Sequence, residues 1–209
     1  MKISEIRDYA KRHKEESITE DKKYSVLIPI IEVDGEIHLL YEVRSKSLRN
    51  QPGEIAFPGG KMEKGEDFLE TAKRETCEEL LLKDDEVEIF GKGDFLINPN
   101  IAILYSAIGE IKKDFKKITP NKDEVEKIFT IPLDYFLKND PEIYRLEVNL
   151  EEIDRFPYEL IPNGRNYKFK RGIEKMCFYI YEDKIIWGLT AKMTYNFIEK
   201  LKKDYVFNK

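Results

Sequence analysis

The chain has 209 residues, of which 41% are apolar and 37% charged, with 36 Lys and Arg against 41 Asp and Glu. A net charge of −5 argues against a broad nucleic-acid-binding surface, and no apolar run reaches the roughly 18 residues of a membrane-spanning helix. The polar N-terminal segment does not resemble a secretory signal, and Cys77 and Cys177 form no metal-ligand spacing. We therefore expect a cytoplasmic protein with no nucleic-acid or membrane partner.

The first half of the chain predicts an N-terminal helix, a hairpin and a long acidic helix. Residues 1–20 are polar and carry the expected N-terminal helix. Two β-rich runs at 24–33 and 37–44 are separated by Asp-Gly-Glu, which is a good hairpin signal. A short strand at 54–60 is expected to end at its proline and glycines, and a helix is predicted over 67–82.

The second half predicts mostly strands and a closing helix. Strands are expected at 87–97 and 101–111, joined near Asn-Pro-Asn, and the residues 142–170 follow no single pattern. The remaining expectations are a strand at 125–133, a short helix at 133–139, a hairpin at 175–189 and an amphipathic helix at 190–207. Strands with interposed helices indicate an α+β fold with a mixed sheet.

The helix at 67–82 is predicted to carry a dense carboxylate face. At about 100° per residue, Glu75, Glu78 and Glu79 share one side, whereas Glu70 points away. Like charges one turn apart weaken an isolated helix by a few tenths of a kcal/mol per pair. A hard divalent cation would relieve this repulsion, and Mg²⁺ prefers oxygen ligands together with substrate phosphates. The alternative is a solvated charged face.

Gly59 and Gly60 stand shortly before this helix. A glycine pair lets the backbone approach an ion or a phosphate without an intervening Cβ.

The stretch from residue 60 to 82 resembles the signature of the Nudix hydrolase family. That pattern is glycine, five residues, glutamate, seven residues, Arg-Glu, an aliphatic, any residue, Glu-Glu, any residue, glycine and an aliphatic. The matching residues are Gly60, Glu66, Arg74, Glu75, Glu78, Glu79 and Leu82. Thr76 replaces an aliphatic residue and Leu81 replaces the final glycine, so we expect a different turn after the helix.

The resemblance implies a single Nudix hydrolase domain over 1–209, folded as a Nudix-like α/β/α sandwich with the Nudix box at 60–82. It implies a diphosphatase in which water activated by Mg²⁺ or Mn²⁺ attacks one phosphorus of a diphosphate. The implied metal ligands are Glu75, Glu79, Glu78 and the backbone carbonyl of Gly59. Nudix domains commonly form homodimers, so a homodimer is expected at the family level.

The resemblance also assigns supporting and catalytic roles. Gly60, Glu66 and Arg74 would hold the loop and the helix in register. The general base would be Glu75 or Glu78, or a carboxylate on a later loop. Glu124, just before a predicted strand, is the candidate on such a loop, and an ordinary loop carboxylate is the alternative.

Three cations precede the box, at Arg44, Lys46 and Arg49. They could form a basic strand end on the surface or a phosphate clamp, since an arginine can contact two phosphoryl oxygens at once. Arg44 and Arg49 are the expected substrate-binding residues.

This segment resembles an extra signature of the coenzyme A diphosphatases within the Nudix family. Its matching residues are Arg44, Ser45, Leu48, Arg49, Pro52, Gly53, Phe57, Pro58, Gly59 and Gly60. Two departures are Tyr41 in place of a leucine and Glu42 in place of a threonine. The implied reaction cleaves coenzyme A or its thioesters into 3′-phosphoadenosine 5′-phosphate and 4′-phosphopantetheine or its acyl derivative.

Two alternatives stay open. One is another Nudix specificity, such as ADP-ribose or another nucleoside diphosphate derivative. The other is a non-catalytic Nudix-like domain that binds a nucleotide metabolite, although the retained glutamate trio argues against it.

Overall fold

The computed structural model describes residues 1–13, 22–98 and 102–207. Its helices and strands, in chain order, are α1 (Ile3–Arg12), β1 (Lys22–Val33), β2 (Glu36–Arg44), β3 (Ile55–Ala56), β4 (Gly59–Lys61), α2 (Phe68–Leu80), β5 (Val87–Asn98), β6 (Ala102–Ile111), β7 (Val125–Pro132), α3 (Leu133–Lys138), β8 (Glu142–Val148), β9 (Gly172–Tyr181), β10 (Lys184–Trp187) and α4 (Gly188–Phe207). No helix among these residues is long and apolar enough to cross a membrane.

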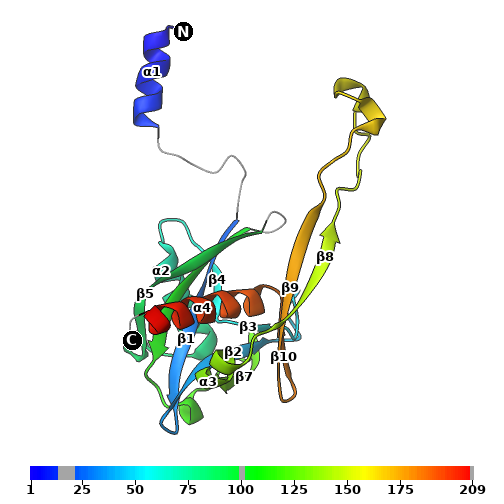
Figure 1. Ribbon diagram of the computed structural model, residues 1–209. Helices are drawn as coiled ribbons and strands as arrows, with labels where there is room; N and C mark the ends of the chain where they lie inside the picture. The colour runs from blue at the N-terminus through cyan, green and yellow to red at the C-terminus, as the bar shows by residue number, and fades with distance from the viewer. Residues whose placement is uncertain (14–21, 99–101, 208–209) are drawn as a thin grey trace.

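The main sheet is mixed and carries helices on both faces (Figure 1). Its strand order is β3-β2-β1-β6-β5, with β7 paired to β2 and β4 paired to β1. β1 and β6 run parallel, and the other pairs are antiparallel. β1 pairs with β4 near its start and with β2 near its end, so it is the central strand. The expected α+β fold with a mixed sheet is confirmed.

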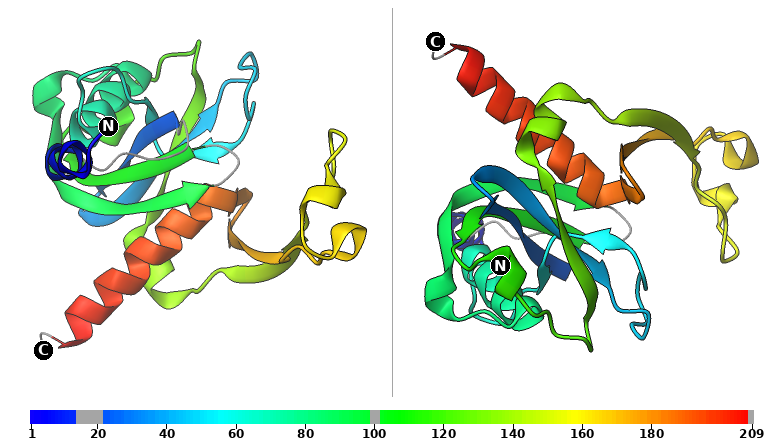
Figure 2. Two further views of the ribbon diagram at one scale, coloured as in Figure 1. Left: turned by 90° about the horizontal axis from the view of Figure 1, so that it is seen from above. Right: turned by 90° about the horizontal axis from the view of Figure 1, so that it is seen from below.

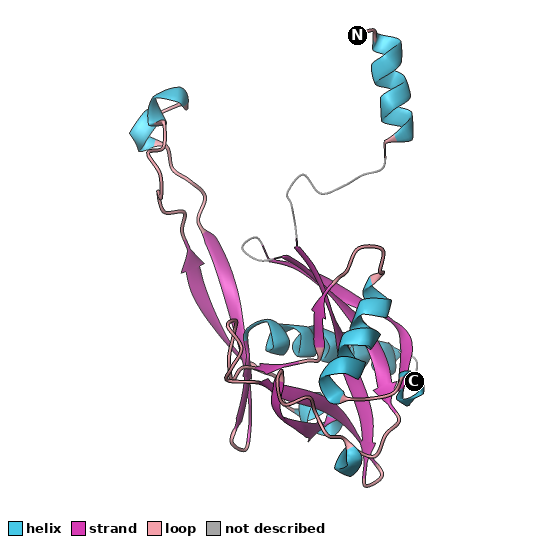
Figure 3. Ribbon diagram, turned by 180° about the vertical axis from the view of Figure 1, so that it is seen from behind, coloured by secondary structure: helices cyan, strands magenta, loops and turns pink. Residues whose placement is uncertain are grey.

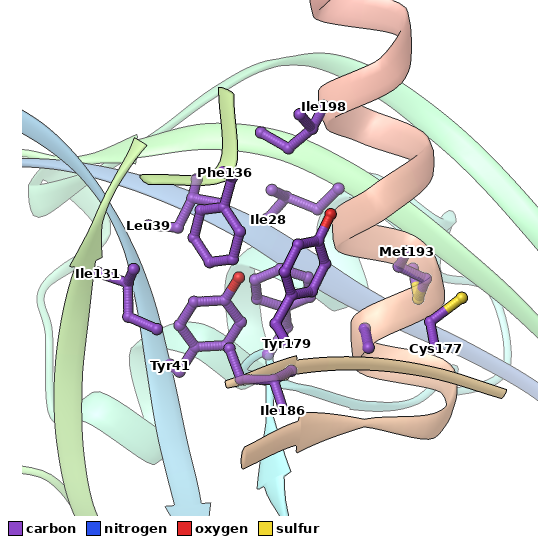
Figure 4. Close-up of a cluster of buried hydrophobic side chains, with 12 residues drawn as sticks. Ile28, Leu39, Tyr41, Ile131, Phe136, Cys177, Tyr179, Ile186, Met193 and Ile198 are labelled. Carbon is purple, nitrogen blue, oxygen red and sulfur yellow. The ribbon is translucent and has the colours of Figure 1, made fainter. Parts of the chain in front are cut away.

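Two buried clusters cover the two faces of this sheet. One joins the sheet to α3, α4, β9 and β10, and Figure 4 shows Tyr41, Phe136 and Tyr179 meeting there. The other joins it to α2, with Leu40 and Leu80 among its members. Because side chains alternate along a strand, β2 is apolar on both faces, as a central strand of such a sandwich requires.

A second sheet, of order β10-β9-β8, was only partly predicted. The hairpin expected at 175–189 is β9–β10, but β9 also pairs with β8, which lies in the segment without a clear pattern. β8 and the adjoining part of β9 extend from the body as an arm (Figures 1 and 3), and every residue of β8 is exposed. Figure 2 shows the same arm from above and below.

Two local expectations differ from the structure, and a third lies outside the described residues. The N-terminal helix ends at Arg12, and residues 14–21 of the segment expected to carry it lie outside the described residues. The join between β5 and β6 also lies outside them, at 99–101. The strand expected at 54–60 is wrong: β3 ends at Ala56, and the glycines do not stop the strand but begin β4, which pairs with β1.

The turn after α2 is strained at Leu81. This residue adopts the left-handed conformation, with φ 48° and ψ 48°, and its side chain is exposed. A left-handed residue with a Cβ costs roughly 1 kcal/mol more than glycine. The chain therefore keeps the turn that a glycine favours without having the glycine.

We expect Leu81→Gly to stabilise the protein by about 0.5–1 kcal/mol, which raises Tm by roughly 1–4 °C in a chain of this size. Leu81→Ala is the matched control, since it removes the same exposed side chain but keeps the Cβ. Thermal unfolding checks both, and an equal Tm for the two variants would contradict the strain.

Candidate active site

The first turn of α2 is fixed by a reciprocal cap. The Asp67 carboxylate accepts hydrogen bonds from the backbone N–H groups of Leu69 (2.8 Å) and Glu70 (2.9 Å). The Glu70 carboxylate accepts from the Asp67 N–H at 2.9 Å. Glu70, the glutamate that the helical projection sets apart, is therefore a capping residue.

Arg74 contacts three glutamates and thereby links the loop before α2, which carries Glu66, to the helix that carries Glu75 and Glu78. It contacts Glu66 twice, from Nε at 2.7 Å and from Nη2 at 3.1 Å. Its Nη1 lies 3.0 Å from Glu75 Oε1 and 3.1 Å from Glu78 Oε2. Nη2 also donates to the Lys61 carbonyl of β4 at 3.4 Å. The structure thus places Arg74 and Glu66 where supports for the loop and helix would be needed.

The Glu66–Arg74 contact predicts a pH dependence. The hydrogen bond from Arg74, and then that from the Glu63 N–H, lowers the pKa of Glu66 from 4.5 to about 2. A lowered folded pKa stabilises above the ordinary value and loses this contribution as pH falls. We expect the stability advantage of wild type over Glu66→Gln to be full above pH 4.5 and to vanish as pH falls through about 2. Urea unfolding at several pH values measures it; a constant advantage over this range contradicts it.

Glu79 is buried against the glycine pair. Its Oε2 accepts a hydrogen bond from the Gly59 N–H at 2.8 Å, and its backbone carbonyl accepts from the Asn121 N–H at 2.8 Å. Burial, and then the charge of Glu42, raises the pKa of Glu79. Gly59 thus positions Glu79 through its N–H. The metal-ligand role that the resemblance implied for its carbonyl stays a prediction.

Both glycines are needed for the close approach of β4. A Cβ on Gly59 would overlap the Ser25 carbonyl and the Val26 backbone, whereas the atoms nearest to a Cβ on Gly60 would be those of the Glu75 carboxylate. The first glycine therefore permits the β1–β4 pairing, and the second leaves room for Glu75.

The three box glutamates have different surroundings. Glu79 is 3% exposed, the Glu75 side chain is 16% exposed, and the Glu78 side chain is 56% exposed beside Arg74. Within the described ranges, no three His, Cys, Asp or Glu side chains are grouped closely enough to hold a metal ion. Glu75 and Glu79 lie inward, and Glu78 lies on the outer side.

Glu42 is a site residue that the sequence did not assign. It is fully buried on β2, and neither carboxylate oxygen has a hydrogen-bond partner in the part of the chain that the structure describes. Burial raises its pKa, Arg44 lowers it, and Glu124 and Glu75 raise it again. The only signal for it was a glutamate where the resembled signature has a threonine.

Of the two predicted substrate-binding arginines, the structure brings one to the carboxylates. Arg44 is close enough to act electrostatically on Glu42 and Glu79. Its Nε is buried and lacks a hydrogen-bond partner among the described residues. Arg49 is exposed in the loop after β2. Lys46 is also exposed, and its Nζ lies 3.5 Å from Glu126.

Glu124 also reaches this region. Its backbone carbonyl accepts from the Ser45 N–H at 2.8 Å, next to Arg44, and its charge acts on Glu42 and Glu75. The loop that carries it is held to α2 by the Asn121–Glu79 backbone bond. These backbone contacts join residues far apart in the sequence, so the sequence alone could name Glu124 as a candidate but could not show its position.

The chemistry of these carboxylates suits a divalent cation. Glu75 raises the pKa of both Glu42 and Glu79, Glu42 also raises that of Glu79, and both oxygens of Glu42 are unpartnered among the described residues. Crowded buried carboxylates are costly unless a cation or proton compensates them. Oxygen ligands of this kind suit Mg²⁺ or Mn²⁺.

Comparison with known proteins establishes the class. The family described as "NUDIX domain" matches residues 21–155, more than half of the chain. The chain belongs to the Nudix family and is an enzyme of this family of hydrolases.

Relatives of known name match beyond the box. Nudix hydrolase 3 of Caenorhabditis elegans is 31% identical over 192 residues, which is 86% of this chain and 73% of that one. A peroxisomal coenzyme A diphosphatase of Mus musculus is 38% identical over 58% of this chain and 51% of its own. A mitochondrial coenzyme A diphosphatase of Homo sapiens is 28% identical over 81% and 65%. The chain thus spans about half to three quarters of these relatives.

Proposed function

We propose that this protein hydrolyses the diphosphate bond of coenzyme A or its thioesters. The products would be 3′-phosphoadenosine 5′-phosphate and 4′-phosphopantetheine or its acyl derivative. The observation that carries the proposal is that Arg44, a residue of the coenzyme A signature, is close enough to the box glutamate Glu79 to act on it electrostatically. The mouse and human relatives named as coenzyme A diphosphatases support the choice of substrate.

Nudix hydrolases generally use divalent metal ions, and we assign Mg²⁺ or Mn²⁺ here. Glu75 and Glu79 would hold the ion, with Glu78 as a further ligand or a water contact. A bound ion of this kind neutralises a diphosphate and lowers the pKa of water. The Gly59 N–H orients Glu79. A ligand role for the Gly59 carbonyl stays a prediction.

The remaining residues position the substrate and move a proton. Arg44 would contact phosphoryl oxygens, with which its guanidinium can form two parallel hydrogen bonds. Arg49, exposed on the adjoining loop, would meet the substrate from solvent. Glu75, Glu78 and Glu124 remain the candidates for the general base. Of these, Glu78 is the most exposed and is paired with Arg74.

The test is parallel hydrolysis of coenzyme A, dephospho-coenzyme A and ADP-ribose with products identified by mass. Coenzyme A is expected to give the highest kcat/KM, because the proposed site prefers the adenosine 3′-phosphate that the other two substrates lack. Fastest cleavage of ADP-ribose would instead support the alternative Nudix specificity. A homodimer and a cytoplasmic location stay predictions, and the mouse and human relatives are named as peroxisomal and mitochondrial.

A further inference from the structure

Glu42 is a buried carboxylate without a structural explanation. It is 0% exposed, and both its oxygens lack a hydrogen-bond partner within the described ranges. An unpartnered buried polar group costs roughly 1–3 kcal/mol, and more if it is charged. An apolar or small side chain at this strand position would avoid that cost, so packing alone does not account for a glutamate.

The side chain of Glu42 lies on the α2 side of the sheet. Tyr41 packs into the cluster with α3 and α4, whereas Leu40 packs into the cluster with α2. Because consecutive residues of a strand point to opposite faces, Glu42 shares the face of Leu40. It therefore points toward the helix that carries Glu75 and Glu79.

The charges that act on Glu42 associate it with the box glutamates Glu75 and Glu79. The residues that act on it electrostatically are Arg44, Glu124 and Glu75. For Glu79, the strongest charge interaction is with Glu42 itself. Glu42 is thus within electrostatic range of both the helix and Glu124.

The protein groups nearby do not satisfy this carboxylate. Arg44 is close, yet its Nε and both Glu42 oxygens are without partners in the described part of the chain. A proton shared between Glu42 and Glu79 would serve one oxygen of each residue and leave the other Glu42 oxygen unpaired. A divalent cation with several oxygen ligands would satisfy both glutamates together.

We propose that Glu42 is a ligand of the divalent cation, contributed by β2 from the sheet that faces α2. The inference rests on the proposed metal-dependent function and adds a residue to that site. The ion would then join the sheet to the helix, and the coordination would not come from α2 alone. The extra carboxylate would also raise the affinity for the ion, since ligand charge tunes affinity at such sites.

The experiment is Mn²⁺ binding to metal-free protein, measured by calorimetry and by the Mn²⁺-dependent rise in Tm. Glu42→Gln is nearly isosteric and is expected to weaken Mn²⁺ binding by roughly tenfold or more. Glu88→Gln on β5 is the matched control, because it removes the same charge from an exposed glutamate paired with Lys112. The control is expected to bind as wild type does.

The outcomes separate this inference from the proposed function. If wild type and Glu79→Gln show the same Mn²⁺ binding, the proposed metal site is overturned. If Glu79→Gln weakens binding and Glu42→Gln does not, only the role of Glu42 is overturned. Crystals of wild type soaked in Mn²⁺ give a test without substitution: a Glu42 oxygen is expected about 2.1 Å from the ion. A separation well beyond coordination distance overturns the assignment.

Discussion

Glu79→Gln should lower kcat by roughly two or more orders of magnitude, since metal-ion charge stabilisation is worth several kcal/mol and each 1.36 kcal/mol is tenfold in rate. The substituted amide keeps an oxygen that can accept the 2.8 Å hydrogen bond from the Gly59 N–H. It also removes one of two buried carboxylates that repel each other. We therefore expect the metal-free variant to melt no lower than wild type.

The two readouts together make this prediction specific. Steady-state kinetics with excess Mg²⁺ gives kcat, and thermal unfolding of metal-free protein gives Tm. Glu70→Gln is the control on the same helix, because Glu70 caps its first turn and lies away from the site. Wild-type turnover by purified Glu79→Gln would place the reaction elsewhere. Lost activity with a much lower Tm would indicate misfolding rather than a missing ligand.

Gly59→Ala is expected to destabilise the protein by about 2–3 kcal/mol, as severe overpacking does. A methyl group here would overlap the Ser25 carbonyl and the Val26 backbone, so the strand pair must separate. That movement also displaces the N–H that orients Glu79. For a chain of this size the fall in Tm is roughly 5–10 °C.

Gly60→Ala is the neighbouring comparison. The atoms nearest to its methyl group would be those of the Glu75 carboxylate, which is the end of a flexible side chain. We expect a clearly smaller fall in Tm together with a large loss of activity, because Glu75 must move. Thermal unfolding of the two alanine variants in parallel decides; equal losses of stability would show that β4 can shift as freely at Gly59 as at Gly60.

Much of the fold could be predicted because its signals are local. The β1–β2 hairpin follows from Asp34-Gly35, which adopts positive φ at both positions. The acidic helix follows from its spacing and cap. The role of the glycines in β4 could not be predicted, because a three-residue strand is defined by its partner and not by its own sequence. The same holds for β8, which is defined by its pairing with β9 and has no buried face in the structure.

The same distinction between local signals and long-range contacts applies to the candidate site. The signature and the helical projection identified Glu75, Glu78 and Glu79 as one group, but periodicity could not show that Glu79 is buried and Glu78 is half exposed. Glu42 was missed as a site residue, because a charged residue in a strand gives no sign of which face it occupies until the pairing is known. Glu124 depended on a loop contact that spans much of the chain.

The central place of β1 has a consequence for the order of folding. This strand pairs with β6 in parallel, and residues Lys22 to Ile30 meet partners some eighty positions later in the chain. Such long-range pairing closes a large loop before it gains contacts, and so forms slowly. Strand β4, which begins with Gly59 and Gly60, pairs with β1, and α2 packs against β1 as well. The candidate site should therefore form only with the final cooperative step of refolding, whereas the β8–β9 pair, which starts at Val148 and Gly172, closes a much shorter loop.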